Sequence, residues 1–433
     1  MYQNLKNKKI NIYTLGCKVN QYESDAMLEE LLNHGCIKAD ENEAADIYII
    51  NTCSVTNMAD RKSRQIIHRM RKQGNPHSVI AATGCYIQAS GQELLKDGSL
   101  DVIIGNNRKK DVARILSQYL SEGNTSDNII DINKATEYEN TKINKPQTHT
   151  RAYVKVQDGC NNFCTYCIIP YVRGRIRSKK LMDIVDEVAT LAENGVKEII
   201  LTGINISNYQ DKDISLTDLI YRISKIQGID RIRMSSIEPR AITKEFLERV
   251  SKIQSFCPHF HLSLQSACNK TLKAMNRKYT IEEYTETVEL LRKYFDRPAI
   301  TTDIIVGFPG ETDEDFKTTY ENLEKLNLYE MHVFKYSKRK GTIAEKMPDQ
   351  VDEQIKTERS NRLLELTEKQ KKAFEMSFSG QIDKILVEEI VQLDGKKYYR
   401  GHTKRYILID KPIEDNADVN KTNNINKEID VQL

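Results

Sequence analysis

Strand-like and helix-like stretches alternate along this chain, and this alternation restricts its fold more than any other feature. Apolar, strand-like runs lie at 9–15, 46–50 and 79–83, and amphipathic helical stretches at 24–33 and 59–73 separate them. Strands that alternate with helices usually form a parallel sheet covered by helices on both faces. We therefore predict an N-terminal parallel α/β sandwich, with the carboxyl ends of its strands at one edge.

Each of these predicted strands is followed closely by a cysteine. Because the strand ends share one edge, Cys17, Cys53 and Cys85 are expected to converge there. Three thiolates can hold an iron–sulfur cluster and leave one iron open. The alternative is three small apolar side chains of the core, since free cysteine is often simply buried. Other cysteines lack this context, and we interpret them as structural: Cys36, Cys257 and Cys268.

A second set of cysteines, Cys160, Cys164 and Cys167, has the spacing C-x₃-C-x₂-C and follows a strand-like run at 153–156. A [4Fe–4S] cluster normally takes four cysteines, so three ligands leave one iron free to bind a substrate or cofactor. The alternatives are a partial zinc site or a disulfide pair. Zinc sites more often combine two C-x₂-C halves, and the chain has no second C-x₂-C.

The run at 158–167 resembles the signature of radical S-adenosylmethionine (SAM) enzymes, which place an aromatic residue beside the last cysteine, as Tyr166 is here. The resemblance implies that SAM chelates the open iron and that Tyr166 packs near its adenine. It also implies that an electron from the cluster cleaves SAM to a deoxyadenosyl radical.

Five more predicted strands follow the second cysteine set, at 198–202, 231–234, 259–264, 300–306 and 330–334. With the run at 153–156 they predict a central, partial TIM-like (β/α)₆ barrel whose site lies at the carboxyl ends of its strands. Resemblance to radical SAM enzymes implies cofactor contacts at several of these ends: Gly203, Glu238, Gln265, Val306 and Phe308. For Glu238 the alternative is an ordinary surface carboxylate.

Two histidines, His259 and His261, occupy one face of a predicted barrel strand and could indicate a metal. No third ligand is near them in the sequence. We therefore expect them to pack in the barrel or to form hydrogen bonds.

Stretches at 15–24, 51–57 and 83–86 resemble the N-terminal domain of the methylthiotransferases, in which the auxiliary cluster is implied to supply or carry sulfur. The alternating stretch after about 380 resembles a TRAM domain, a small β-barrel that binds RNA, in an apparently shortened form. The expected domains are 1–120 (auxiliary cluster), 121–145 (a linker with a short strand at 129–132), 146–375 (radical SAM) and 376–433 (TRAM-like with a polar tail).

Clustered basic residues predict contact with an RNA backbone. The candidates are Arg61, Lys62, Arg64, Arg69 and Arg71 in the second helical stretch, Arg175 after the second cysteine set, and Arg400, Lys404 and Arg405 in the TRAM-like part. In the TRAM-like part they alternate with tyrosines, which suits base stacking. The alternatives are a solvated helix face and an ordinary charged β-hairpin.

Three stretches, 16–24, 56–65 and 336–342, resemble the bacterial threonylcarbamoyladenosine branch of the methylthiotransferases. The resemblance implies methylthiolation of carbon 2 of N6-threonylcarbamoyladenosine at tRNA position 37. It also implies two [4Fe–4S] clusters, SAM, the tRNA anticodon stem-loop as partner, and an electron donor such as flavodoxin or ferredoxin. Related branches act on isopentenyladenosine in tRNA or on a ribosomal-protein aspartate. A non-catalytic iron–sulfur RNA-binding redox sensor is the alternative from another class.

The composition agrees with a cytoplasmic protein. The net charge is only +3, so any RNA contact must come from local patches. No apolar run approaches the roughly 18 residues that a membrane-spanning helix needs. The N-terminal residues lack the apolar core of a signal peptide.

Overall fold

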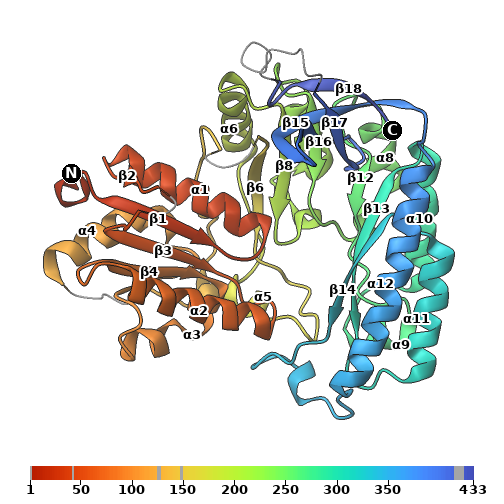
Figure 1. The fold of residues 1–433 in the computed structure, drawn as a ribbon. Coiled ribbons are helices and arrows are strands. Elements are labelled where there is room, and N and C mark those ends of the chain that lie inside the picture. The colour runs from red at the N-terminus through yellow and green to blue at the C-terminus, as the bar shows by residue number, and fades with distance from the viewer. Residues whose placement is uncertain (1, 41–42, 124–127, 147–149, 414–423) are drawn as a thin grey trace.

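The computed structural model describes residues 2–40, 43–123, 128–146, 150–413 and 424–433 (Figure 1). Its N-terminal part is a parallel sheet of order β2-β1-β3-β4-β5. The strands are β1 (Lys9–Thr14), β2 (Ile37–Lys38), β3 (Ile47–Thr52), β4 (Val79–Gly84) and β5 (Val102–Ile104). The helices are α1 (Lys18–Asn33), α2 (Asn57–Gln73), α3 (Cys85–Lys96) and α4 (Val112–Glu122).

Alternate residues of the N-terminal strands point to opposite faces, which gives the sheet two separate cores. Ile47 and Ile49 of β3 pack with α1 and α4 on one face. Tyr48 and Ile50 pack with α2 and α3 on the other. This confirms the predicted sandwich.

Six parallel strands form the central part, as the helix–strand alternation predicted. They are β6 (Ala152–Asp158), β8 (Glu198–Gly203), β11 (Arg231–Met234), β12 (His259–His261), β13 (Ala299–Val306) and β14 (Glu330–Lys335). They lie in two hydrogen-bonded sheets, of which the first also carries antiparallel β7 (Arg177–Ser178). Isolated parallel bridges, Ile232 to Phe256 and Ile237 to Leu262, join the two sheets at the β11–β12 boundary.

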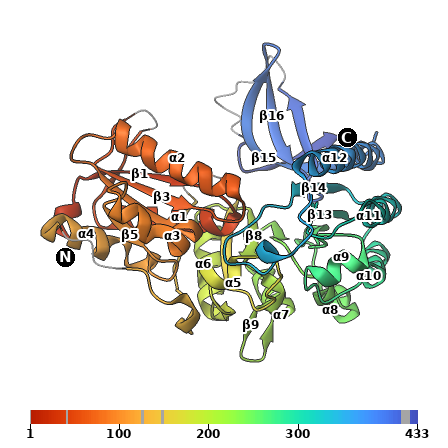
Figure 2. The same ribbon diagram turned by 90° about the horizontal axis from the view of Figure 1, so that it is seen from below.

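Helices cover the outside of this partial barrel (Figure 2). They are α6 (Leu181–Glu193), α7 (Leu216–Ile223), α8 (Lys244–Val250), α9 (Asn269–Ala274), α10 (Ile281–Tyr294) and α11 (Asp313–Leu326), with short α5 (Ile169–Val172) after the cysteine loop. Capping boxes start α7, α10 and α11, for instance Thr312 with Asp315 at the start of α11. Each box satisfies backbone N–H groups that the first turn leaves free.

The long helix α12 (Glu353–Met376) leads to an antiparallel sheet of order β17-β16-β15-β18. Its strands are β15 (Ile382–Leu393), β16 (Lys396–His402), β17 (Leu408–Pro412) and β18 (Glu428–Gln432). The small C-terminal β module is therefore present as predicted, with its last strand paired to β15. Its strand order is linear, as in an open half-barrel. Much of the expected polar tail, residues 414–423, lies outside the described residues.

Local predictions were wrong in two places. The strand expected at 129–132 is absent among the described residues there; Ile132–Lys134 is a 3₁₀ turn. The Gln88 side chain donates to Ile130 O, so a side chain takes the place of a strand partner. Likewise β12 ends at His261 rather than at 264, because Thr302 Oγ1 accepts from Leu264 N. No described helix is both long and apolar enough to cross a membrane.

Candidate active site

The structure brings Cys17, Cys53 and Cys85 to the carboxyl edge of the N-terminal sheet. Cys17 caps α1, Cys53 directly follows β3, and Cys85 begins α3. The three thiols are close enough to interact electrostatically. Burial raises the pKa of Cys53 to about 12, so the free thiol is protonated at neutral pH. A metal centre would have to stabilise the thiolate form.

An arginine from the central part, Arg173, reaches this cysteine set. Its Nε donates to Cys85 Sγ at 3.4 Å. Its other nitrogens donate to Glu23 Oε1 at 2.5 Å and Asn20 Oδ1 at 2.6 Å, both on α1. Burial opposes ionisation of Glu23, but Arg173, Lys109 and Lys155 together hold its pKa well below the ordinary value. A buried ionic network therefore joins the two parts of the molecule beside Cys85.

The second set, Cys160, Cys164 and Cys167, lies in the loop after β6. This loop folds back on itself, and Cys160 N donates to Gly174 O at 3.0 Å. Gly159 makes the fold possible: its φ is +74°, and a Cβ there would lie 1.9 Å from Arg175 O. Burial raises the pKa of Cys167 to about 12.

A second arginine, Arg277, contacts this set as Arg173 contacts the first. Its Nη1 donates to Cys164 Sγ at 3.3 Å, and its Nη2 lies 2.9 Å from both carboxylate oxygens of Glu238. A cationic donor beside a sulfur suits a negatively charged metal ligand. Each cysteine set, three thiols with one arginine directed at a sulfur, thus fits an iron–sulfur cluster.

A pocket of about 270 Å³ lies between the two cysteine sets. Tyr166 and Cys167 line one side, and Val55 and Thr56, which follow Cys53, line the other. Further lining comes from barrel strand ends and neighbouring loops: Ile168, Ile169, Gln265, Asp303, Ile305, Phe334, Lys335, Tyr336 and Ser337. The side chains of both Val55 and Phe334 are exposed, which is uncommon for large apolar residues unless something covers them.

The buried side chain of Arg339 holds in place the loop after Cys53, which forms one wall of this pocket. Its guanidinium donates to Ser54 Oγ at 2.6 Å and to Asp60 Oδ2 at 2.8 Å. Ser337 Oγ accepts from Asn57 N at 3.0 Å. The loops after β3 and β14 therefore form one continuous wall, although they are far apart in the sequence.

A second pocket, of about 340 Å³, opens beside Cys164 and is lined mostly by polar residues. Asn205, Glu238 and Arg277 line it, together with Asn162, whose Nδ2 donates to Glu238 Oε1 at 3.1 Å. Its position at the carboxyl ends of β8 and β11 is where a barrel normally binds its ligand. These polar donors and acceptors could hold the amino-acid and ribose groups of SAM.

The other residues predicted to contact SAM lie at strand ends in different surroundings. Gly203 ends β8 and pairs with Gln157. Gln265 lines the pocket between the cysteine sets. Val306 and Phe308 are buried, and Phe308 packs edge-on against Tyr166 at 6.5 Å between ring centroids. Phe308 is therefore a buried packing partner of the Tyr166 ring.

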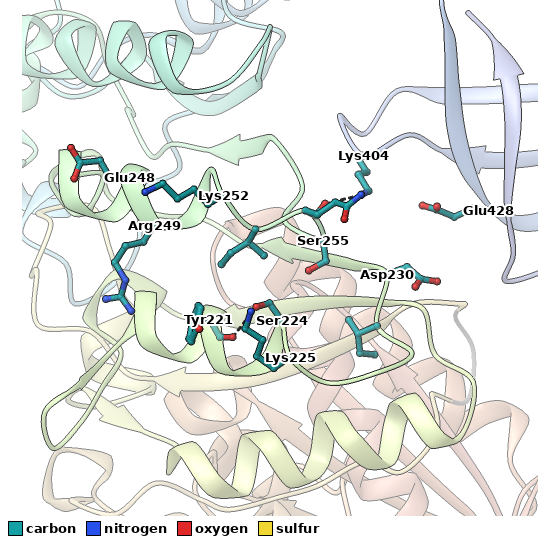
Figure 3. A pocket seen from close by; sticks show the side chains of 13 residues that line it. Tyr221, Ser224, Lys225, Asp230, Glu248, Arg249, Lys252, Ser255, Lys404 and Glu428 are labelled. Carbon is teal, nitrogen blue, oxygen red and sulfur yellow. Dashed lines mark hydrogen bonds between the residues drawn. The ribbon is translucent and has the colours of Figure 1, made fainter.

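A larger cavity, of about 920 Å³, lies at the other end of the barrel (Figure 3). Asp230 directly precedes β11, and Ser255 lies in the segment that leads into β12, so this cavity opens at the amino ends of the strands. Lys404 and Glu428 of the C-terminal sheet form another part of its lining. None of the six predicted cysteine ligands lines it. Size alone therefore does not identify the active site.

The predicted RNA-binding residues fall into two groups. Arg61, Lys62, Arg64 and Arg69 are exposed on α2, and Arg175 is exposed on the cysteine loop. The side chains of the second group form ion pairs or backbone hydrogen bonds within the protein: Arg71 pairs with Asp101, Arg400 pairs with Asp410, Lys404 donates to Gln254 O, and Arg405 donates to Arg297 O. In the first group Arg64 also donates to the hydroxyl of Tyr86 at 3.0 Å.

The loop with Lys404 and Arg405 docks on the barrel. Tyr406 stacks on His259 at 5.0 Å and lies under the guanidinium of Arg233 at 4.8 Å. Arg233 also donates to Lys404 O at 3.0 Å. Sequence analysis did not single out Arg277, Arg233 or Arg339, because each is one arginine whose partners lie on other elements.

Comparisons with known proteins agree with this geometry. Residues 154–323 match the Radical SAM superfamily, and residues 9–105 match a family described as Uncharacterized protein family UPF0004. Over 404 residues the chain is 39% identical to Threonylcarbamoyladenosine tRNA methylthiotransferase MtaB of Bacillus subtilis, covering 92% of this chain and 89% of that protein. It is 38% identical over 402 residues to tRNA-2-methylthio-N(6)-dimethylallyladenosine synthase of Thermoanaerobacter pseudethanolicus, covering 90% and 84%.

Among solved structures, the radical S-adenosylmethionine methyltransferase TsrM of Kitasatospora setae superposes with a TM-score of 0.56. The sequence identity is 14%, and the superposition covers 76% of this chain and 75% of that chain. At this identity the likeness supports the fold alone.

Proposed function

Because the chain belongs to the radical SAM tRNA methylthiotransferases, we propose that it methylthiolates carbon 2 of N6-threonylcarbamoyladenosine at tRNA position 37. The observation that carries this proposal is the pocket between the two cysteine sets, which Tyr166 and Val55 line from opposite sides. A base in this pocket would lie within reach of both sets. The name of the Bacillus subtilis relative, a threonylcarbamoyladenosine tRNA methylthiotransferase, supports the choice of base.

Members of this family use SAM and two [4Fe–4S] clusters. Here Cys160, Cys164 and Cys167 would hold the cluster that binds SAM, and Cys17, Cys53 and Cys85 the auxiliary cluster. When bound, these groups supply the hydrogen abstraction and the sulfur chemistry that an unactivated C–H bond of adenine requires.

The residues of the chain itself bind and orient. Asn162, Glu238 and Arg277 form a polar pocket beside Cys164 that would hold SAM. In the pocket between the cysteine sets, Phe334 and Val55 offer apolar surface on which a base could stack. Ile168, Ile169 and Ile305 would exclude water from the reacting edge.

The anticodon loop must open for the base to reach this pocket, which is usual when single-stranded RNA is recognised. Exposed basic residues of α2 are suited to contact the backbone of the anticodon stem-loop, since α2 begins directly after the loop with Val55 and Thr56. The electron would come from a small donor protein such as flavodoxin or ferredoxin. We propose the cytoplasm as the site of action, because tRNA is modified there.

The test uses anaerobically reconstituted protein with SAM, a reductant and anticodon stem-loops that carry either threonylcarbamoyladenosine or dimethylallyladenosine. Mass spectrometry of the digested nucleosides should show the methylthio product on the first RNA. Product on the dimethylallyl RNA alone would assign the chain to the other branch. Cluster reduction with no SAM cleavage and no product on either RNA would instead favour a redox sensor.

A further inference from the structure

Three polar side chains cluster inside the barrel: His261, Asp303 and His332. One ligand atom of each lies within 4.8 Å of the others. They come from β12, β13 and β14, where His261 is paired with Thr301 and Asp303 with His332. The two possible co-ligands of His261, Asp303 and His332, therefore lie on β13 and β14, far from His261 in the sequence.

Hydrogen bonds and charge hold this cluster in place. His261 Nδ1 lies 2.9 Å from Thr301 Oγ1, and its Nε2 lies 3.4 Å from Asp303 Oδ2. Lys18, the neighbour of Cys17, also interacts electrostatically with Asp303.

Asp303 connects this cluster to the pocket between the cysteine sets, because it belongs to the cluster and also lines the pocket. Ile305 and Phe334 line that pocket and pair with each other one layer above the Asp303–His332 pair. Residues two apart on a strand share a face and are separated by roughly 7 Å. Asp303 itself lines the pocket. An N6 substituent on a base held near Phe334 could therefore reach the two histidines.

His332 is the member of the cluster that is free to meet such a substituent. It is exposed, and its ring packs against that of His261 at 5.7 Å between centroids. Within the described part of the chain the side chain of His332 has no hydrogen bond or ion pair. A threonylcarbamoyl group presents carbonyl, hydroxyl and carboxylate oxygens, whereas a dimethylallyl group presents none.

We propose that His261, Asp303 and His332 form the subsite for a polar N6 substituent that carries hydrogen-bonding groups, and that His332 discriminates against an apolar one. This inference rests on the function proposed above. A polar group of the site that the wrong substrate leaves without a hydrogen-bond partner is a strong source of discrimination.

The experiment compares the reconstituted wild-type enzyme with His332→Phe and His332→Gln on both stem-loop RNAs. His77→Phe is the matched control, because His77 is exposed and lies just before β4, at the sheet end opposite Cys85. For His332→Phe, the ratio of kcat/KM on threonylcarbamoyl RNA to that on dimethylallyl RNA should fall about tenfold or more. The glutamine variant, which keeps a donor, should retain part of the ratio, and His77→Phe all of it. Iron content and melting temperature verify that each variant is folded.

An unchanged ratio in folded His332→Phe would overturn the inference. The same three side chains could instead hold a divalent transition metal. A stoichiometric non-iron metal that is present in the wild type and absent from His332→Phe would therefore overturn it as well. Failure of the proposed function looks different, because the wild-type enzyme would then leave threonylcarbamoyl RNA unmodified.

Discussion

Arg173 shows how one residue can serve several parts of this molecule. It follows the loop of the second cysteine set in the sequence, yet its guanidinium donates to Cys85 of the first set and to Glu23 of α1. Its side chain is fully buried. A buried guanidinium is tolerated only when carboxylates and other acceptors surround it.

We predict that Arg173→Met destabilises the protein by roughly 3–5 kcal/mol, because Glu23 and Asp158, both of which pair with Arg173, would each lose one of the buried cations that balance their charge. The measurement is denaturant unfolding of the reduced apoprotein. Arg175→Met is the control, since this exposed arginine of the same loop should change the unfolding free energy by less than about 0.5 kcal/mol. Equal effects of the two substitutions would contradict the assigned role.

At the scale of elements, the turns after the strands decide where the cysteines lie. The β4–α3 turn places Cys85 at the start of α3 through Gly84, whose φ is +97°. A Cβ on Gly84 would lie 2.2 Å from Thr52 O of the neighbouring strand. The close approach of β3 and β4 at Cys53 and Cys85 therefore requires glycine at this position.

We predict that Gly84→Ala displaces Cys85 and removes the auxiliary cluster. Reconstituted wild-type protein should contain about eight irons, four from each cube, and the variant about four. Gly98→Ala is the control: its φ is also positive, at +74°, but no atom lies within 4 Å of the new Cβ. It should keep the full iron content. Full iron in Gly84→Ala would show that the turn tolerates a side chain.

At the scale of the whole molecule, three parts of the chain meet around one barrel lumen. α1 brings Lys18 and Glu23 toward β6, and the C-terminal sheet inserts Tyr406 beside His259. The pocket between the cysteine sets lies at the carboxyl ends of the strands, and the C-terminal sheet docks where Arg231 and Arg233 donate to its backbone.

This arrangement predicts that α2 carries more of the RNA affinity than the basic residues of the C-terminal sheet. Replacing the exposed Arg61, Lys62 and Arg69 by glutamine should lower the slope of log K against log salt by about 2. Arg400→Gln should change it little, because Arg400 already pairs with Asp410 at 2.7 Å. The measurement is stem-loop binding at several salt concentrations. The reverse order of effects would place RNA on the C-terminal sheet.

Sequence patterns predicted the architecture because they are local. The strand before Cys53 and the helix after it are each visible in a short run of residues, and parallel pairing then brings the strand ends together. The arginines that complete the site carry no such signal. Arg173 and Glu23 are 150 residues apart, and the His261–Asp303–His332 cluster depends on the register of three strands.

The central claim is that the two cysteine sets hold clusters with separate roles in one methylthio transfer. It is tested most directly by assaying Cys53→Ala and Cys164→Ala on threonylcarbamoyl stem-loop RNA, with deoxyadenosine and the methylthio nucleoside quantified in the same reaction. Cys164→Ala should form neither product. Cys53→Ala should still form deoxyadenosine but no methylthio nucleoside. Methylthio nucleoside formed by Cys53→Ala at the wild-type rate would contradict the account.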